Sequence, residues 1–335
     1  MESLRSGKFF LPNTGASRKT ESNSQEPKRV ANPNALRELE SRIHDIQILP
    51  ALPSVLVPLM ELLKQPLEKI EVNRIVELVS SDKSIAAQCL RMTNSAAFGR
   101  RYEIETVRDA VVALGVWRVS DIVFSCVVPS ALPIISELIN PGVFWRHALA
   151  CALVSQRLAQ SVRSYASRQA YLAGLVHDLG ILVNAKLFPD EFRAAYEKAS
   201  RESLPLDVAE HEMIGFSHCD SGRMLASAWN LPKDIAVVQQ YHHSVTDAPT
   251  TKDLTAIVHL SDLLCRDLGL GYGYPERRQI DFTCSPAWLL LIQTCRQMGK
   301  PDVGGLSNEL QRYFQDVVGQ VDRLLGPMEI LKKPN

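Results

Sequence analysis

Apolar residues recur at helical spacing along nearly the whole chain from Leu49 onward. In residues 72–79 the apolar positions are i, i+3, i+4 and i+7, which places them on one face of a helix. Residues 55–63 carry a similar apolar stripe. Asp82 has a short carboxylate suited to capping a third helix. The first part of the chain therefore predicts a series of packed helices.

The same periodicity predicts helices in most of the remaining chain. They cover residues 107–114, 119–128, 144–162, 168–183, 189–201, 205–214, 218–229, 233–242 and 251–268, followed by 287–298 and 308–325. Residues 49–99 contain no convincing run of the alternating pattern that marks strands. Helices joined by short connections are typical of an all-α protein.

The N-terminal segment has a different composition. Residues 13–34 contain no aromatic residue, leucine or isoleucine, so they cannot bury enough apolar area to offset the entropy lost on ordering. We therefore expect a disordered tail over residues 1–40, which serves as a solvated linker rather than as a binding element.

Composition limits the classes of protein. Of the 335 residues 46% are apolar, enough for a sizeable core, and 37 basic residues balance 37 acidic ones. Without a net field we expect no binding to nucleic acid. The most apolar window, residues 122–135, is broken by Pro129 and Pro133 and is shorter than the roughly 20 residues that span a bilayer. We expect no membrane-spanning segment.

The cysteines and the N-terminal residues indicate the cellular compartment in which we expect the protein. The seven cysteines are odd in number, far apart and form no C-x-x-C pair, which argues against a disulfide framework or a zinc knuckle. Residues 9–11 are apolar, but they form no run long enough for a signal peptide. Both features predict a cytoplasmic protein with buried thiols.

Histidines are concentrated in one part of the chain. Seven of the eight lie between residues 147 and 259. Imidazole and carboxylate groups suit a borderline or hard divalent ion, and packed helices can direct several of them to one place. The candidate metal ligands, in chain order, are His147, His177, Asp178, His218, His242, His243 and Asp262.

His177 and Asp178 are adjacent in the apolar segment LAGLVHDLGIL. Neighbouring residues in a helix point about 100° apart, but both side chains can reach one ion in a groove between helices, or bracket two. With two ions, an aspartate can bridge them and orient water for attack on a phosphate. Asp178 is the candidate for that role.

Each candidate also has a structural interpretation. His147 can be a core histidine bonded to a backbone carbonyl, and Asp262 can pair with Arg266. His242 and His243 can complement the dipole at a helix C-terminus. Together, several buried ionisable groups with no cation among them would be costly, which favours a metal. A hydrogen-bonded polar network without metal is a third interpretation.

Several segments resemble the HDOD family, the bacterial signalling modules named as HD-related output domains. The family's opening motif is similar to LPALPSVLVPLMELL (49–63), and its most recognisable stretch to SSDKSIAAQCLRMTNSAAFG (80–99). The resemblance continues through TVRDAVVALGVWRVSDIV (106–123), FWRHALACALVSQRLA (144–159), YLAGLVHDLGILV (171–183), GFSHCDSGRMLASAWNLP (215–232) and YHH (241–243). It covers residues 49–243 and extends more loosely to Leu268.

The resemblance implies a two-part helical HDOD domain over residues 41–268. An N-terminal helical bundle, residues 41–140, is joined to residues 141–268, a subdomain related to the HD metal-dependent phosphohydrolases. We expect residues 269–335 to form a helical C-terminal extension that packs on the main body and takes part in dimerisation or docking.

The resemblance also implies a role for each candidate ligand. The positions where HD phosphohydrolases carry their H…HD…D ligands are occupied by His147, His177, Asp178 and Asp262. The extra histidines that HD-GYP cyclic-di-GMP phosphodiesterases use for further metals are similar to His218, His242 and His243. The implied cofactor is one or two divalent ions of iron, manganese, magnesium or zinc.

Two departures from the HD-GYP pattern argue against catalysis. HD-GYP enzymes place a lysine that faces the substrate phosphate at the position of Ile181, which has no charge to offer. Their substrate loop follows the paired histidines, where this chain has residues 244–249. The chain does contain a GYP tripeptide, at residues 273–275, but it lies downstream of Asp262 and therefore does not correspond to that substrate loop.

We therefore expect a regulatory or scaffold protein of bacterial signal transduction, with a metal held as a structural pin. Its expected partners are two-component or cyclic-di-GMP pathway proteins, or a second copy of the chain, bound on the N-terminal bundle near residues 80–99. The alternative is a metal-dependent phosphodiesterase that acts on a cyclic dinucleotide, with Asp178 as the catalytic ligand.

Overall fold

The computed structural model of the protein describes residues 30–43, 54–63, 65–95, 103–134, 136–162, 168–271, 285–297, 313 and 316–326. All regular structure in these residues is helical, so the predicted all-α fold class is confirmed. None of the helices described is long and apolar enough to cross a membrane.

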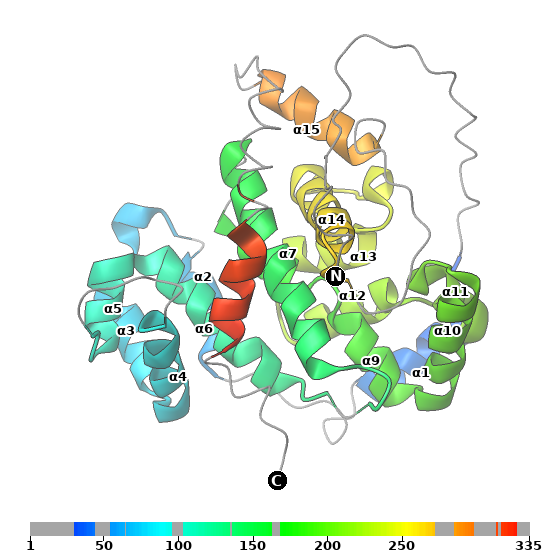
Figure 1. Ribbon diagram of the computed structural model, residues 1–335, viewed down its shortest axis with the longest axis horizontal. Coiled ribbons are helices and arrows are strands. Elements are labelled where there is room, and N and C mark those ends of the chain that lie inside the picture. The colour runs from blue at the N-terminus through cyan, green and yellow to red at the C-terminus, as the bar shows by residue number, and fades with distance from the viewer. Residues whose placement is uncertain are drawn as a thin grey trace, which may run out of the picture.

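The N-terminal bundle forms one end of the molecule in Figure 1. It contains α2 (Leu56–Leu63), α3 (Val72–Ser80), α4 (Lys83–Thr93), α5 (Val107–Leu114) and α6 (Val116–Ala131). The side chain of Asp82 caps α4, because it accepts the backbone N–H groups of Ser84 at 2.9 Å and Ile85 at 3.1 Å. The capping role predicted for Asp82 is confirmed.

Helix α6 is longer than its periodicity predicts. The sequence predicts a helix over residues 119–128, whereas α6 starts at Val116 and continues to Ala131 with Pro129 inside its last turn. A proline removes one N–H donor from a helix. Nearly all of α6 is buried, so tertiary packing outweighs this local cost.

The second group of helices holds the candidate site. It contains α7 (Pro141–Ser161), α8 (Ala170–Val176), α9 (Leu179–Leu187), α10 (Pro189–Glu202), α11 (Leu206–Met213), α12 (His218–Ala228), α13 (Lys233–Tyr241) and α14 (Lys252–Asp267). Helix α15 (Pro286–Gln297) packs on α14. Residues 316–325 form a further helix, drawn in red beside α7 in Figure 1, which is tied to α7 by the Arg146–Asp322 ion pair at 3.0 Å.

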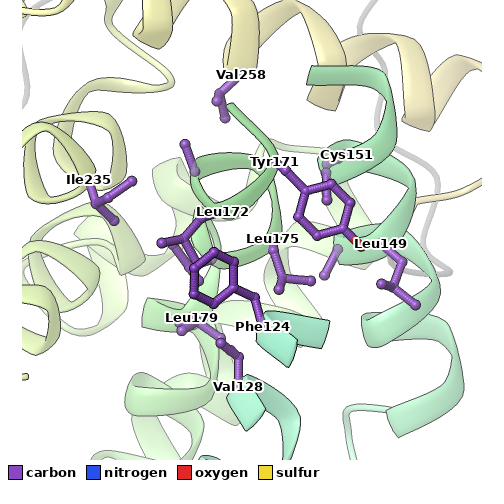
Figure 2. Close-up of a cluster of buried hydrophobic side chains, with 14 of the residues drawn as sticks. Phe124, Val128, Leu149, Cys151, Tyr171, Leu172, Leu175, Leu179, Ile235 and Val258 are labelled. Atoms are coloured by element: carbon purple, nitrogen blue, oxygen red, sulfur yellow. The ribbon is translucent and has the colours of Figure 1, made fainter. Parts of the chain in front are cut away.

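Helix α8 lies at the centre of the core (Figure 2). The side chains drawn around it come from α6, α7, α9, α13 and α14, so one short helix contacts both groups of helices. Gly174 makes this packing possible, because a Cβ atom there would lie 2.6 Å from the carbonyl oxygen of Cys151. The hydroxyls of Tyr171 and Ser125 form a buried hydrogen bond of 2.7 Å that joins α8 to α6.

The chain breaks its helix at His177 and Asp178. Periodicity predicts a single helix over residues 168–183, but α8 ends at Val176 and α9 starts at Leu179. Asp178 has φ −106° and ψ 13°, outside helical geometry. Helix α9 then packs so closely on α12 that a Cβ atom at Gly180 would lie 1.9 Å from the carbonyl oxygen of His218.

The N-terminal segment differs from the expectation. Residues 33–40, which the composition places in a disordered tail, belong to α1 (Pro33–Ile43), and this helix packs on α12. Leu39 and Ile43 are its buried residues, and they supply the apolar contact that residues 13–34 lack. Residues 1–29 and the GYP tripeptide at 273–275 lie outside the described residues, as does part of the helix predicted over 308–325.

Candidate metal centre

Asp178 lies at the centre of the predicted cluster. Its Oδ2 atom is 2.8 Å from Nε2 of His177 and 3.6 Å from Nε2 of His147. Its Oδ1 atom is 3.2 Å from Nε2 of His242 and 3.4 Å from Nε2 of His218. One carboxylate therefore faces two pairs of imidazoles, one pair with each oxygen.

The first half of the site adds Asp262 of α14 to His147 and His177. Oδ1 of Asp262 lies 3.2 Å from Nε2 of His147 and 3.9 Å from Nε2 of His177. Ligand atoms bound at about 2.0–2.2 Å in tetrahedral or octahedral geometry lie roughly 3.0–3.5 Å apart. The spacing of these nitrogen and oxygen atoms is close to that range.

The second half of the site consists of His218, His242 and His243. The Nε2 atoms of His218 and His243 are 3.1 Å apart, and the rings of His242 and His243 have centroids 4.1 Å apart. His218 begins α12, whereas His242 and His243 directly follow α13. The structure thus brings all seven candidate residues together, although more than a hundred positions separate them.

The histidines expose the same nitrogen to the centre. Nδ1 donates to a backbone carbonyl oxygen in three of them: His147 to Leu270 at 2.7 Å, His177 to Gly174 at 2.8 Å, and His242 to Gln239 at 2.8 Å. When Nδ1 carries the proton of a neutral imidazole, Nε2 presents a lone pair, which is the form that binds a metal.

Several buried atoms in the cluster have no hydrogen bond of suitable geometry. They are Nε2 of His177, Nε2 of His242, both carboxylate oxygens of Asp178 and Oδ2 of Asp262. Such groups are costly to bury, and here they are close to one another yet not aligned as donors and acceptors. Imidazole nitrogens and carboxylate oxygens directed at common points fit one or two divalent cations.

Glu210 of α11 supports the second half. Its Oε2 atom accepts the ring Nδ1–H of His218 at 2.6 Å and the backbone N–H of His218 at 2.8 Å, and Asn184 donates to Oε1 at 2.9 Å. Glu210 is fully buried and is not among the site residues predicted from the sequence. It lies one helical turn after the buried Leu206, on the buried face of α11, and no sequence motif marks it.

Asp262 forms the ion pair with Arg266 that its structural interpretation predicts, beside the candidate metal ligands. Nε of Arg266 donates to its Oδ1 atom at 2.7 Å, while Oδ2 has no hydrogen bond. One of the buried carboxylates is therefore compensated by a cationic side chain, that of Arg266. The oxygen that faces His147 and His177, Oδ1, is thus the one that Arg266 contacts.

Without a bound metal ion, protonated imidazoles balance the negative charge of the carboxylates in the first half of the site. Burial lowers the pKa of His147, but hydrogen bonds and charges from Asp178 and Asp262 outweigh burial and raise that pKa to about 10. Burial also opposes ionisation of Asp178, yet the charge of His177 and the neighbouring imidazoles hold the pKa of Asp178 well below its usual range. A divalent ion would displace protons from these imidazoles.

The second half has one neutral member. Burial lowers the pKa of His243, and the positive charges of His242 and His218 lower it further. Burial also lowers the pKa of His242, but the charge of Cys219 and the hydrogen bond with Asp178 raise it to about 10. His243 is the one candidate that is only partly buried, so it lies where the site is closest to solvent.

Two cysteines that the sequence analysis treated as ordinary buried thiols lie beside the site. Sγ of Cys151 is 3.5 Å from Nε2 of His147, and Sγ of Cys219 is 3.9 Å from Nδ1 of His242. With the thiols included, the two groups able to hold a metal are His147, Cys151, His177 and Asp262, and His218, Cys219, His242 and His243.

Ile181 is a residue of the hydrophobic core. It is 3% exposed and lines a small apolar cavity with Val143, Phe144, Tyr196 and Leu206 among its other walls. The cavity measures about 20 Å³, room for about one water molecule. The position at which HD-GYP enzymes carry a phosphate-facing lysine is therefore part of the apolar core.

The fold and the site define an all-α protein whose histidines and aspartates converge between its helices. The family model described as HDOD domain matches residues 49–245. This match covers more than half of the chain, and the chain belongs to the HDOD family.

One relative is similar to the chain over most of its length. An uncharacterized protein of Treponema pallidum (strain Nichols) is 26% identical over 232 residues, which cover 69% of this chain and 44% of that protein. The chain thus spans less than half the length of this relative.

Solved structures have the same fold. An HDOD domain protein of unknown function from Geobacter sulfurreducens has a TM-score of 0.76 and 24% identity, covering 87% of this chain and 97% of that one. A candidate signal transduction protein from Marinobacter aquaeolei VT8 has a TM-score of 0.69 and 21% identity, covering 90% and 65%. At these identities the likeness concerns the fold alone.

Proposed function

We propose that this chain is a cytoplasmic regulatory module of bacterial signal transduction, which acts by binding other proteins and holds one or two divalent ions as a structural pin. Its membership of the HDOD family supports the signalling role. Its partners are two-component or cyclic-di-GMP pathway proteins, with a second copy of the chain as a further partner.

The main observation in favour of a structural metal is that the convergent ligands are enclosed by protein. The side chains of His147, His177, Asp178, His242 and Asp262 are at most 2% exposed. A structural metal site is closed by protein ligands, whereas a catalytic site keeps a position open to substrate. Enclosure therefore favours a pin over a reaction centre.

The pin would join elements that are distant in sequence. Its ligands come from α7, the α8–α9 junction, α12, the end of α13 and α14. A cation bound by all of them would stabilise the folded state through its binding energy, because the unfolded chain has no such site. The burial of Ile181 in an apolar cavity supports the same interpretation, since it removes the charge that would contact a phosphate.

The test of the pin is elemental analysis together with an activity assay. Protein purified without chelator is expected to contain one or two equivalents of a divalent metal and to leave cyclic-di-GMP unchanged in the presence of Mn²⁺ or Fe²⁺. Asp178→Ala is expected to lose the metal. Metal-free wild-type protein would contradict the pin.

The signalling role has its own test. Full-length protein used as bait is expected to capture two-component or cyclic-di-GMP pathway proteins, with cross-links on the N-terminal bundle. Light scattering on the purified chain measures the predicted self-association. If the bait captures none of these proteins and the purified chain is a monomer, a scaffold role is contradicted.

A metal-dependent phosphohydrolase is the second candidate, and one observation favours it. The two oxygens of Asp178 face different pairs of histidines at 2.8–3.6 Å, which is the arrangement of a carboxylate that bridges two ions. Two such ions supply Lewis-acid activation of water in phosphate hydrolysis. Turnover of a cyclic dinucleotide that Asp178→Asn abolishes would favour this candidate over the pin.

A further inference from the structure

We propose that α1 positions His218 by clamping the turn that leads into α12. Helix α1 covers Pro33–Ile43, whereas the HDOD match begins at residue 49. This helix packs on α12 and, in Figure 1, appears in blue away from the N-terminal bundle. The clamp itself is independent of the proposed function, and only its effect on metal affinity rests on the metal pin.

The first contact of the clamp is at the start of α1. The backbone N–H of Asn32 donates to the carbonyl oxygen of Gly215 at 2.7 Å. The side chain of Asn32 meanwhile accepts the N–H of Asn34 at 2.9 Å, which caps α1. One residue therefore both begins the helix and ties it to the turn at residues 214–217.

Gly215 shows how closely the turn and the helix fit. Its φ of +95° lies in the region that favours glycine. A Cβ atom at this position would lie 3.1 Å from Cβ of Asn32 and 3.2 Å from Cβ of Ala35, which is tighter than ordinary packing. The turn is thus pressed directly against the first turn of α1.

The second contact is at the end of α1. The guanidinium of Arg42 lies 4.4 Å from the ring centroid of Phe188 and donates to the carbonyl oxygen of Leu187. Phe188 packs edge-to-face on Phe216, with ring centroids 5.3 Å apart. Because Phe216 is fully buried and directly follows Gly215, α1 holds the turn through its backbone and through an aromatic pair.

The clamped turn determines the position of His218. Ser217 caps α12 in a capping box with Asp220, and His218 is the first residue of that helix. A shift of the turn would therefore move His218 relative to Asp178. The contacts of α1 described here involve α12 and the α9–α10 connection, not the helices that carry His147 and Asp262.

Undocking α1 in the full chain tests the proposal. Leu39 and Ile43 are 0% and 5% exposed, so the double variant Leu39→Asp, Ile43→Asp should release the helix. After treatment with chelator, we expect amide hydrogen exchange in residues 33–43 and 214–221 to accelerate about tenfold or more, and exchange in α7 to stay unchanged. Glu40→Ala changes an exposed residue of the same helix, and the amide hydrogen exchange of this variant should equal that of the wild-type protein.

Fast exchange in residues 33–43 with wild-type exchange in residues 214–221 would overturn the proposal. Arg42→Ala is the milder variant, because it removes the contacts of the guanidinium with Phe188, Leu187 and Glu38 and leaves Leu39 and Ile43 in place. It provides the test if the double variant fails to fold. We expect it to accelerate exchange in residues 214–221 to a smaller extent, and no acceleration in a folded Arg42→Ala protein would also overturn the clamp.

Metal titration provides a second readout. With Zn²⁺ we expect the α1 variants to weaken binding in the half that contains His218 by about 10–100-fold, and to leave the other equivalent unchanged. Equal weakening of both equivalents would contradict a specific effect on His218. Wild-type protein that binds no Zn²⁺ would refute the pin, and the exchange experiment would still decide whether α1 clamps the turn.

Discussion

One carboxylate oxygen of Glu210 accepts two hydrogen bonds from His218, the ring Nδ1–H at 2.6 Å and the backbone N–H at 2.8 Å. The second carboxylate oxygen accepts a hydrogen bond from Asn184 at 2.9 Å. With both oxygens engaged, Glu210 holds the proton of His218 on Nδ1 and directs Nε2 toward Asp178, 3.4 Å away. Glu210 is thus the residue that orients one predicted ligand.

We expect Glu210→Gln to weaken metal binding in the His218 half about 10–100-fold, because the neutral amide no longer supports the charge and tautomer of His218. Competition with a chromophoric chelator measures the affinity, and circular dichroism checks the fold. Glu212→Gln is the matched control, since Glu212 lies on the same helix and is exposed. Equal loss of affinity in both variants would argue against an orienting role for Glu210.

Gly180→Ala is expected to destabilise the protein by about 3 kcal/mol or more. The added Cβ would lie 1.9 Å from the carbonyl oxygen of His218 and 2.7 Å from the backbone N of Gly222, so α9 and α12 would have to separate. Urea denaturation measures the change in the free energy of unfolding.

Gly319→Ala is the control for that experiment. Its Cβ would lie 3.3 Å from a nitrogen of the Arg323 side chain, which can move away. Since alanine favours a helix over glycine, we expect a gain of up to about 1 kcal/mol. A Gly180→Ala protein as stable as wild type would show that α9 and α12 can separate at little cost.

Removal of metal is expected to lower the melting temperature of the wild-type protein. A ligand that binds only the folded state at 100 times its Kd stabilises that state by about 2.7 kcal/mol. Differential scanning fluorimetry with and without EDTA measures the shift, and Asp178→Ala should not respond to EDTA. An unchanged wild-type melting temperature would favour the hydrogen-bonded network without metal.

The membership of the cluster could be predicted from residue type, but its division around Asp178 could not. Histidines and aspartates in an otherwise apolar helical region need compensation wherever the fold buries them. The division depends on the break between α8 and α9. Apolar residues on both sides, such as Val176 and Leu179, continue the helical pattern and hide the end of α8.

Glu210 and helix α1 could not be predicted from the sequence for a different reason. Glu210 occurs in no recognisable motif, and only the packing of α11 shows that its carboxylate is buried. Helix α1 has two buried anchors, Leu39 and Ile43, which are too few to make a long apolar stripe. Its stability comes from docking on α12, a contact between segments distant in sequence that local composition does not encode.

Asp121 gives the N-terminal bundle a pH dependence that can be tested apart from the metal. It is 5% exposed on α6, and its Oδ2 atom accepts a hydrogen bond from Gln156 of α7 at 2.6 Å. Burial raises its pKa from 3.8 to about 7, although the Gln156 hydrogen bond and the charge of Arg118 act in the opposite direction. The folded state therefore favours the protonated acid.

Because the folded pKa lies above the unfolded value, the stability linked to this proton is fully present below about pH 4 and is lost as pH rises through 7. We expect wild-type protein to lose up to about 4 kcal/mol between these limits through Asp121. Asp121→Asn keeps an oxygen acceptor for Gln156 and cannot ionise, so its free energy of unfolding should fall less between pH 5 and pH 8. Urea denaturation at both pH values measures this free energy, and Asp109→Asn, at an exposed position, is the control. Parallel pH profiles for wild type and Asp121→Asn would mean that Asp121 is already ionised in the folded protein, and that Arg118 and Gln156 compensate its burial.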